Sequence, residues 1–440
     1  MSENPNQNLN PNQDQDLNPN QDQDLNPASA LAPELEERAA ALDSADELGK
    51  LREQFVLDAG SDPAADAAGV YLDGNSLGAL PRSVPGRVAD VVEREWGQLR
   101  IRSWTESGWW TAPERIGDRI APIVGAAAGQ IVVGDSTSVN VFKAVVGAVR
   151  LTGGPEAGRD EILVDESTFP TDGYIAESAA RMTGCTLRAM APAAMPGALG
   201  PRTAAVLVNH VDYRTGRLHD LPGITAAVRG AGAIAVWDLC HSAGALPVGL
   251  DEHGVDLAVG CTYKFLNGGP GSPAYLYVAE RHQGAFDSPL PGWNSHAEPF
   301  GMRPAYAPAD GALRGRVGTP DILSMLALEE SLKVWDGVSV DAVREKSLAL
   351  TDFFLECVAA HVPAGSVTSV TPEEHAERGS QVALRCDGAA AVMDELIARG
   401  VVGDFRAPDV LRFGFTPLYV GFAEVERAAR VLGEVLRSRS

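Results

Sequence analysis

Residues 257–278 have the sequence LAVGCTYKFLNGGPGSPAYLYV, in which Lys264 lies between two apolar runs and beside a glycine-rich turn. The runs Leu257–Gly260 and Ala274–Val278 have the length and apolar character of buried strands. The whole chain has only five lysines, against 31 arginines. A lysine at a strand end, beside glycines that let a ligand approach the backbone, can form a Schiff base with a carbonyl cofactor. We therefore predict that Lys264 is the reactive lysine.

The other four lysines occupy less suitable positions. Lys50, Lys333 and Lys346 lie in amphipathic helical stretches, where lysine is usually a solvated surface charge. Lys143 lies one turn inside a predicted helix. It could touch a phosphate bound at the start of that helix, but a place on the helical surface is favoured.

Short apolar runs alternate with helical patterns from about residue 130 to residue 280. This alternation predicts an α/β fold, in which a mostly parallel sheet is covered by helices on both faces. The remaining strand candidates in this part are 130–133, 162–165, 204–209 and 233–237, and its helices include 140–151 and 172–182.

Besides this α/β region, the rest of the chain is predicted to form three further parts. After a helix near 322–335, strands near 382–385 and 410–415 alternate with helices near 389–399 and 423–437. We expect a disordered acidic tail (1–28), a helical N-terminal arm that belongs partly to the small domain (29–75), a large cofactor-binding α/β domain (76–325) and a small C-terminal α+β domain (326–440).

Composition narrows the classes of function. The tail contains an eight-residue repeat, LNPNQDQD, that is too polar to form a core. The net charge of −23 makes nucleic acid and anionic membrane surfaces poor partners. The chain lacks a membrane-spanning apolar run and the pattern of a signal peptide, and its five scattered cysteines fit reduced thiols in the cytoplasm.

An anion site is predicted where a strand candidate meets a helix. GDSTSVN (Gly134–Asn140) places hydroxyl side chains and free backbone N–H groups at a helix N-terminus, which is a common site for phosphate. The alternative is a plain helix cap by Ser136 or Ser138.

An aromatic face and an acid follow two other strand candidates. In ESTFPTDGY, Phe169 can stack on a flat ring with Thr171 and Asp172 near its edge; the alternative is a proline turn that Asp172 caps. Asp238 and His241 follow one strand and can face one pocket, where Asp238 can neutralise a ligand cation. A metal site there is disfavoured, because no third or fourth ligand lies nearby in the sequence.

Together these features fit pyridoxal 5'-phosphate (PLP). This cofactor needs a lysine for its aldehyde, an acid for its pyridinium nitrogen, a helix N-terminus for its phosphate and an aromatic face for its ring. The set is more specific than any single feature, so we predict a PLP-dependent enzyme.

The chain resembles the bacterial kynureninases from about Phe55 to its C-terminus. It carries, in the order of that family, the motifs YLDGNSLGALP, IRSW, DSTSVN, FPTD, YRTGRLHD, WDLCHSAGA, CTYKFLNGGPG, GWNSH and LRFGFTPLY. The resemblance implies the fold-type I of PLP enzymes, related to the class V aminotransferases, with a mostly parallel seven-stranded sheet between helices. It also implies a cytoplasmic homodimer with active sites at the subunit interface.

The implied reaction is the hydrolytic Cβ–Cγ cleavage of L-kynurenine to anthranilate and L-alanine. This is a step of tryptophan degradation through kynurenine, which also serves NAD biosynthesis. Weaker activity on 3-hydroxykynurenine is expected as well.

The resemblance also assigns roles to single residues. Lys264 matches the Schiff-base lysine, Tyr263 a tyrosine that contacts the phosphate and assists proton transfer, and Asp238 the partner of the pyridinium nitrogen. Arg412 matches the arginine that binds the substrate carboxylate, whereas Asn209 is at a position that is often Ser or Thr in the family. The other expected cofactor contacts are Thr137, Ser138, Phe169, Pro170, Thr171, Asp172 and His241, with Trp293 and Thr319 from the partner subunit, and the other expected substrate contacts are Trp104, Asn75 and Ser76.

Trp104 and Thr319 also predict which substrate ring is preferred. Family members that favour 3-hydroxykynurenine carry a histidine and an asparagine at the matching positions. Trp104 has a broad apolar face with one N–H donor, and Thr319 is short. The resemblance therefore implies a preference for the unsubstituted ring of L-kynurenine. The alternative is that Trp104 only packs under the ring and Thr319 only touches phosphate.

Two other classes of protein fit the sequence less well. A cysteine desulfurase needs a reactive cysteine on a mobile loop, but Cys357 lies in a helical pattern and Cys386 ends a strand candidate. A cofactor-binding scaffold without activity needs a damaged site, and the sequence lacks none of the expected catalytic residues.

Overall fold

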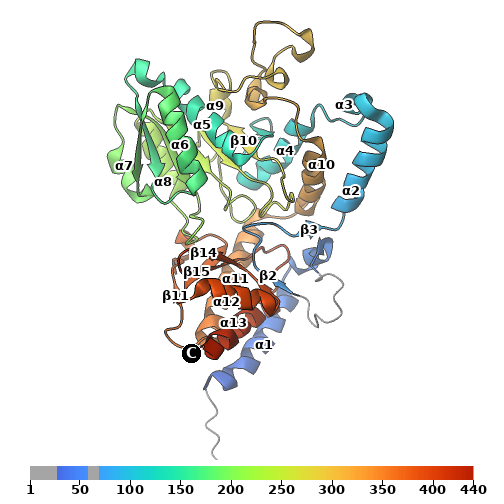
Figure 1. Ribbon diagram of the computed structural model, residues 1–440, viewed down its shortest axis with the longest axis vertical. Helices are drawn as coiled ribbons and strands as arrows, with labels where there is room; N and C mark the ends of the chain where they lie inside the picture. The colour runs from blue at the N-terminus through green and yellow to red at the C-terminus, as the bar shows by residue number, and fades with distance from the viewer. Residues whose placement is uncertain (1–26, 58–68, 440) are drawn as a thin grey trace, which may run out of the picture.

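The computed structural model describes residues 27–57 and 69–439, which are arranged as Figure 1 shows. The tail predicted for residues 1–28 lies outside the described residues up to position 26. None of the helices in the described ranges combines the length and the apolar character that crossing a membrane requires.

A seven-stranded sheet forms the centre of the larger part of the molecule. Its strands are β4 (Ile131–Val133), β5 (Glu161–Asp165), β6 (Thr186–Met190), β7 (Thr203–Asn209), β8 (Ile234–Asp238), β9 (Leu257–Gly260) and β10 (Tyr275–Val278). They lie in the order β4-β10-β9-β8-β7-β5-β6, and only β10 is antiparallel to its neighbours. The predicted α/β fold with a mostly parallel sheet is confirmed.

The central strands are apolar on both faces because helices cover both faces. Ile162 and Val164 of β5 belong to the cluster under α5 (Thr137–Leu151) and α6 (Pro170–Thr183), whereas Leu163 belongs to the cluster on the opposite face. That second face is covered by α4 (Ala112–Val124) and α8 (Leu221–Gly230). The side chains of the edge strand β6 are exposed or half-buried, so its sequence contains no apolar run from which the strand could be predicted.

A four-stranded antiparallel sheet forms the centre of the C-terminal part, as the predicted α+β pattern requires. Its strands lie in the order β11 (Thr368–Ser369), β12 (Gln381–Arg385), β15 (Val410–Gly414) and β14 (Asp404–Arg406). The helices of this part are α11 (Val340–His361), α12 (Ala389–Ala398) and α13 (Phe422–Arg439).

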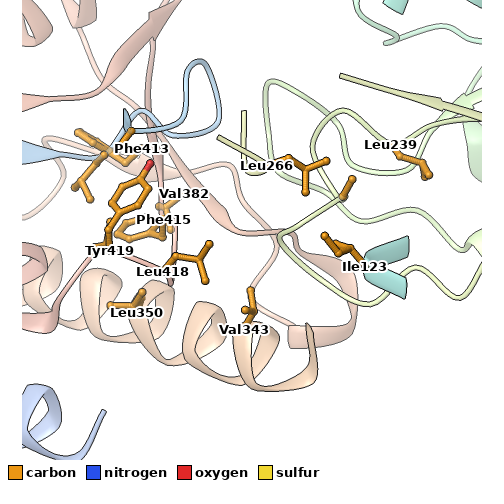
Figure 2. Packing of buried hydrophobic residues seen from close by; sticks show 14 of the residues in the cluster. Ile123, Leu239, Leu266, Val343, Leu350, Val382, Phe413, Phe415, Leu418 and Tyr419 are labelled. Atoms are coloured by element: carbon orange, nitrogen blue, oxygen red, sulfur yellow. The ribbon is translucent and has the colours of Figure 1, made fainter. Parts of the chain in front are cut away.

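One apolar core joins the C-terminal part to the large sheet. Phe354 of α11 lies 5.2 Å, between ring centroids, from both Phe413 and Phe415. Figure 2 shows Phe413 and Phe415 at one end of this cluster and Leu266 and Leu239 toward the other. Because the core is continuous, side chains of the C-terminal sheet can be held against the edge of the large sheet.

The N-terminal segment completes the C-terminal part. Helix α1 (Pro27–Ala45) lies beside α13 and α11 (Figure 1), and Leu35 and Ala39 are buried there. Strand β2 (Val70–Tyr71) pairs in parallel with β13 (Val401–Val402).

The boundaries of the four predicted parts stay a prediction. The remaining α-helices and strands are β1 (Phe55–Val56), β3 (Leu80–Pro81), α2 (Val84–Asp90), α3 (Ser103–Glu106), α7 (Met195–Ala198), α9 (Glu280–Gln283) and α10 (Ile322–Ser331).

Two lysines that we expected on helical surfaces are buried, so that prediction was wrong for them. Lys143 donates hydrogen bonds to Asp135 at 2.8 Å and to the carbonyl of Gly315 at 2.7 Å. Lys346 contacts Asp46 at 2.6 Å and donates to the carbonyl of Pro417. Amphipathic spacing could not predict this, because segments distant in sequence cover the polar side of each helix and pair the charge.

Candidate active site

A cavity of about 120 Å³ opens at the carboxyl ends of β7 and β8. Most of the predicted cofactor contacts line it, together with Tyr213 and Cys240, which the sequence analysis did not assign. Tyr213 begins the motif YRTGRLHD, and its place shortly after a strand end is a signal that could have identified it. The lining residues are Thr137, Ser138, Phe169, Thr171, Asp172, Asn209, Tyr213, Asp238, Cys240, His241, Tyr263 and Lys264.

The parallel strands explain why these residues meet. Asn209 ends β7 and Asp238 ends β8, and the two are paired across neighbouring strands. His241 follows in the turn after β8, while Tyr263 and Lys264 lie in the loop after β9. Neighbouring parallel strands end at one edge of the sheet, so residues far apart in sequence share one crevice.

The amine of Lys264 lies 2.8 Å from Nε2 of His241. Burial, with a smaller contribution from the charge of Lys264, holds the pKa of His241 well below its usual value. His241 is therefore a neutral imidazole at pH 7. The ammonium of Lys264 also lies 5.8 Å from the ring centroid of Tyr263. Burial raises the pKa of Tyr263, so its phenol keeps its proton and can donate it.

Asn209 bridges two carboxyl groups at the back of the cavity. Its Nδ2 donates to Oδ2 of Asp238 at 2.8 Å and to Oδ2 of Asp172 at 3.5 Å, while its Oδ1 accepts from Thr168. Oδ1 of Asp238 accepts from the backbone N–H of Cys240 at 2.7 Å. Burial and the charge of Asp238 raise the pKa of Asp172 well above its usual value. The arrangement therefore pairs a carboxylate at Asp238 with a neutral acid at Asp172.

The start of α5 forms the opposite end of the cavity. Ser136 is the N-cap residue, and its hydroxyl accepts from the backbone N–H of Val139 at 3.4 Å. The cap considered in the sequence analysis is thus real. It leaves the next two residues, Thr137 and Ser138, lining the cavity at the positive end of the helix dipole. The same helix start can therefore be both capped and open to an anion.

Phe169 forms an aromatic wall of the cavity. It is 42% exposed and stands edge-on to Tyr213, with the ring centroids 5.2 Å apart and the planes at 87°. Helix α6 begins at Pro170, and its N-cap residue Phe169 makes no side-chain cap. Asp172 is buried against Asn209, so the alternative in which Asp172 caps this helix is wrong.

Arg412 is buried beside the cavity but does not line it. Its Nε and Nη2 donate to the two oxygens of Asp404, Nη2 also donates to Ser76 at 2.9 Å, and Nη1 donates to the carbonyl of Tyr213 at 2.6 Å. Asn75 contacts Gln381 instead. Because these partners occupy most of the guanidinium, a substrate carboxylate has to displace Ser76 or Asp404 to bind Arg412 with two bonds.

We expect Arg412→Ala to weaken binding of amino-acid ligands by roughly 10- to 150-fold, the worth of hydrogen bonds to a charged group. Inhibition constants for paired substrate analogues with and without the α-carboxylate measure this effect, which should be confined to the carboxylate-bearing analogue. Arg406→Ala is the matched control, because Arg406 contacts the same Asp404 at 2.7 Å. Equal weakening of both analogues would mean that Arg412 only supports the fold.

Trp104, Trp293 and Thr319, which were expected at the site, lie elsewhere in the structure. Trp104 and Trp293 stand edge-on with ring centroids 6.3 Å apart, and Trp293 also contacts Trp110 and Phe300. Thr319 lines a separate small cavity next to Lys143. In the part of the chain that the structure describes, none of these three residues lines the cavity of Lys264.

The described ranges also contain no group of three or more His, Cys, Asp or Glu side chains arranged to hold a metal ion.

Comparison with known proteins gives close relatives over nearly the whole chain. The family model described as "Kynureninase C-terminal domain" matches residues 343–432. A kynureninase of Burkholderia pseudomallei is 47% identical over 91% of this chain and 95% of its own length. A kynureninase of Deinococcus radiodurans is 49% identical over 90% of this chain and 95% of its own length.

Solved structures with a similar fold are more distant in sequence. The cysteine desulfurase CsdA from Escherichia coli has a TM-score of 0.73 at 17% identity and covers 89% of this chain and 99% of its own. A C-DES variant with glycine covalently linked to its PLP cofactor has a TM-score of 0.72 at 19% identity and covers 87% and 98%. These likenesses establish the fold alone, that of the PLP-dependent enzymes. The identity to the curated relatives, sustained over nine-tenths of the chain, is what defines the family: this protein belongs to the kynureninases.

Proposed function

We propose that this protein is a PLP-dependent kynureninase, which hydrolyses L-kynurenine to anthranilate and L-alanine. The observation that carries the proposal is Lys264, whose amine lies in the cavity 2.8 Å from His241 and shares it with Asp238. L-kynurenine is proposed as the substrate because the chain is 47–49% identical to kynureninases. Purified protein supplied with PLP and L-kynurenine should release anthranilate, which its fluorescence measures. Absence of anthranilate with full cofactor loading would contradict the proposal.

The residues around the cavity fit PLP at each of its functional groups. Lys264 would hold the aldehyde carbon, and the carboxylate of Asp238 would pair with the ring nitrogen. Phe169 would cover one face of the ring, and the start of α5 at Thr137 and Ser138 would receive the phosphate. When bound, the cofactor supplies an electron sink for the carbanion at Cα of the substrate.

The protein's own side chains then divide the proton transfers. Lys264, which would hold the cofactor in the resting enzyme, would also be the base that removes the proton from Cα of the substrate. Water adds to the γ-carbonyl, and cleavage of the Cβ–Cγ bond releases anthranilate. Tyr263, a phenol with a raised pKa, can protonate the remaining β-carbon. The neutral acid of Asp172 beside Asp238 limits the negative charge at the back of the cavity to one.

A cysteine desulfurase function, suggested by the fold neighbours, lacks a suitable thiol. Cys240 lines the cavity, but its hydrogen bond with Cys261 and its burial raise its pKa well above the usual value, so it stays protonated. Cys357 and Cys386 are buried, and burial raises their pKa values to about 12 and about 11, so both stay protonated and unreactive. Burial also raises the pKa of Cys185. All five cysteines are free, which supports a reducing compartment, the cytoplasm.

We further propose that the active form is a homodimer whose sites lie at the subunit interface. Trp293 and Thr319, expected near the cofactor, do not line the cavity of their own chain among the described residues. Trp293 belongs instead to an aromatic cluster with Trp104, Trp110 and Phe300, in which Phe300 is 70% exposed. An exposed aromatic cluster of this kind is typical of an interface, and a two-fold partner would bring it to the other subunit's cavity.

Mixing two inactive variants tests this arrangement. Lys264→Ala and Trp293→Ala should each lose activity, but subunit exchange between them creates dimers with one intact site. An equal mixture should therefore recover about a quarter of the wild-type activity, because half of the dimers are mixed and each has one working site of two. Anthranilate release before and after exchange measures it. No recovery with proven subunit exchange would place Trp293 at the site of its own chain.

Trp104 and Thr319 should set the preference for the unsubstituted substrate ring. We expect kcat/KM to favour L-kynurenine over 3-hydroxykynurenine by roughly 10- to 100-fold, since an apolar wall rejects an added hydroxyl only to that extent. Steady-state kinetics with both substrates measures the ratio. The double variant Trp104→His with Thr319→Asn should bring the ratio of the two kcat/KM values closer to one. Equal use of both substrates by the wild type would show that these residues do not determine the specificity.

A further inference from the structure

The amide of Gln381 has a single possible orientation. Gln381 is the first residue of β12, is 1% exposed, and reaches from the C-terminal sheet to the cavity edge. Its Nε2 donates to the carbonyl of Tyr213 at 3.2 Å and to that of Asp212 at 3.5 Å. Carbonyl oxygens can only accept hydrogen bonds. The Nε2 group must therefore face these carbonyls, and Oε1 must face the opposite side.

On that opposite side, Oε1 of Gln381 meets the ring of His241. Oε1 accepts from Nδ2 of Asn75 at 3.3 Å and lies 3.2 Å from Nδ1 of His241. An amide oxygen only accepts, so Nδ1 of His241 must carry a proton. The side chain also packs closely against the backbone of Gly216, where an added Cβ would lie only 2.8 Å from Cγ and 3.5 Å from Cδ of Gln381. The amide has little room to turn.

The proton on Nδ1 decides what Nε2 of His241 can do. Burial and the charge of Lys264 depress the pKa of this imidazole, so it carries one proton only. Nε2 is then a lone-pair acceptor, and the amine of Lys264 at 2.8 Å is the donor. When Lys264 acts as the base it is an uncharged amine, and a proton on Nε2 would then turn the lone pair of Lys264 toward His241 and away from the substrate.

We propose that Gln381 is a positioning residue of the reaction: it fixes His241 as the acceptor tautomer, and His241 thereby holds the lone pair of Lys264 free for the substrate. This inference rests on the proposed kynureninase function. It adds a residue of the C-terminal sheet that touches neither cofactor nor substrate but acts through His241. It also gives the base an acceptor for its N–H groups after the proton of Cα has been taken up.

The tautomer itself can be observed without substrate or cofactor. In ¹⁵N spectra of the apo-protein labelled at histidine, with His241 identified by its absence in His241→Gln, the wild type should carry the proton on Nδ1. In a Lys264→Ala background, which leaves no amine to donate to Nε2, Gln381→Met keeps the size of the side chain but loses the amide and should move that proton to Nε2. Gln381→Glu keeps an acceptor oxygen for Nδ1 and should preserve the wild-type tautomer.

Kinetics should follow the tautomer. In the PLP-loaded enzyme, Gln381→Met should lower kcat by about 100-fold, the cost of a misdirected catalytic group, with little change in KM. Gln381→Glu should recover most of that loss. Gln130→Met is the matched control: Gln130 is also buried and hydrogen-bonded through both ends of its amide, but its partners, Asp251 and the backbone N–H of Glu280, do not line the cavity. The Gln130→Met variant should have a lower free energy of unfolding than the wild type but the same kcat.

The inference is overturned if the wild-type apo-protein carries the proton on Nε2 of His241, a result that needs no variant of Gln381 to fold. It is also overturned if the folded variant Lys264→Ala with Gln381→Met keeps the proton on Nδ1, or if folded Gln381→Met keeps a kcat within twofold of the wild type. Failure of the proposed function is a separate outcome: wild-type enzyme loaded with PLP would then release no anthranilate, whatever the tautomer.

Discussion

Lys264→Ala is expected to lower anthranilate release by more than about 10⁴-fold, because the covalent attachment of the cofactor and the base that removes the Cα proton disappear together. The substitution removes the only lysine among the cavity's lining residues. It also leaves His241 without its 2.8 Å partner. We expect the fold to survive, since His241 is neutral and the buried carboxylate of Asp238 keeps its hydrogen bonds from Asn209 and from the backbone N–H of Cys240.

Borohydride reduction followed by peptide mapping checks the same prediction chemically. In the wild type the reduced cofactor should be found on the peptide that contains Lys264, and in Lys264→Ala it should be absent. Lys143→Met is the control, because Lys143 is a buried lysine in the first half of α5, paired with Asp135 and the carbonyl of Gly315. The Lys143→Met variant should be less stable than the wild type, but the reduced cofactor should still be found on the peptide that contains Lys264. Label on Lys143 in the wild type would contradict the assignment.

The sequence predicted the sheet and most of the cavity because both depend on local patterns. Apolar runs with turn residues between them identify buried strands, and in a parallel sheet the residues after each run meet at one edge. Asp238, Phe169 and Lys264 could therefore be assigned to one site before any distance was known. Strand β6 was not predicted, because an edge strand with exposed side chains has no apolar run.

What the sequence could not predict depends on contacts between distant segments. Gln381 lies 140 positions from His241 in the chain, and nothing in the run QVALR indicates that its first residue turns toward the cavity. The burial of Lys143 depends in the same way on Gly315, which covers the end of its side chain. Asp404 beside Arg412 is a third case, since only the pairing of β14 with β15 brings them together. Such contacts follow from tertiary packing, which spacing along one element does not encode.

The second large effect is expected from Asp238→Ala. The cofactor's ring nitrogen would lose the carboxylate that keeps it protonated, which costs roughly 2–5 kcal/mol for a buried charge pair, or about 30- to 5,000-fold in kcat. Asn209 and the backbone N–H of Cys240 would also lose their acceptor. Steady-state kcat and the affinity for PLP measure the effect, with Asp238→Asn as the control that keeps the shape. Unchanged turnover would remove Asp238 from the electron-sink role.

The residual activity of Asp238→Ala should come from Asp172. The charge of Asp238 is, after burial, the main reason that the pKa of Asp172 is raised, so its removal lets Asp172 ionise at a lower pH. Asn209 already joins the two positions through one amide group. A carboxylate at Asp172 would then partly replace the lost one, with better activity as pH rises. Adding Asp172→Asn to Asp238→Ala should abolish that pH-dependent remainder, whereas an unchanged pH profile in the double variant would show that Asp172 does not substitute for Asp238.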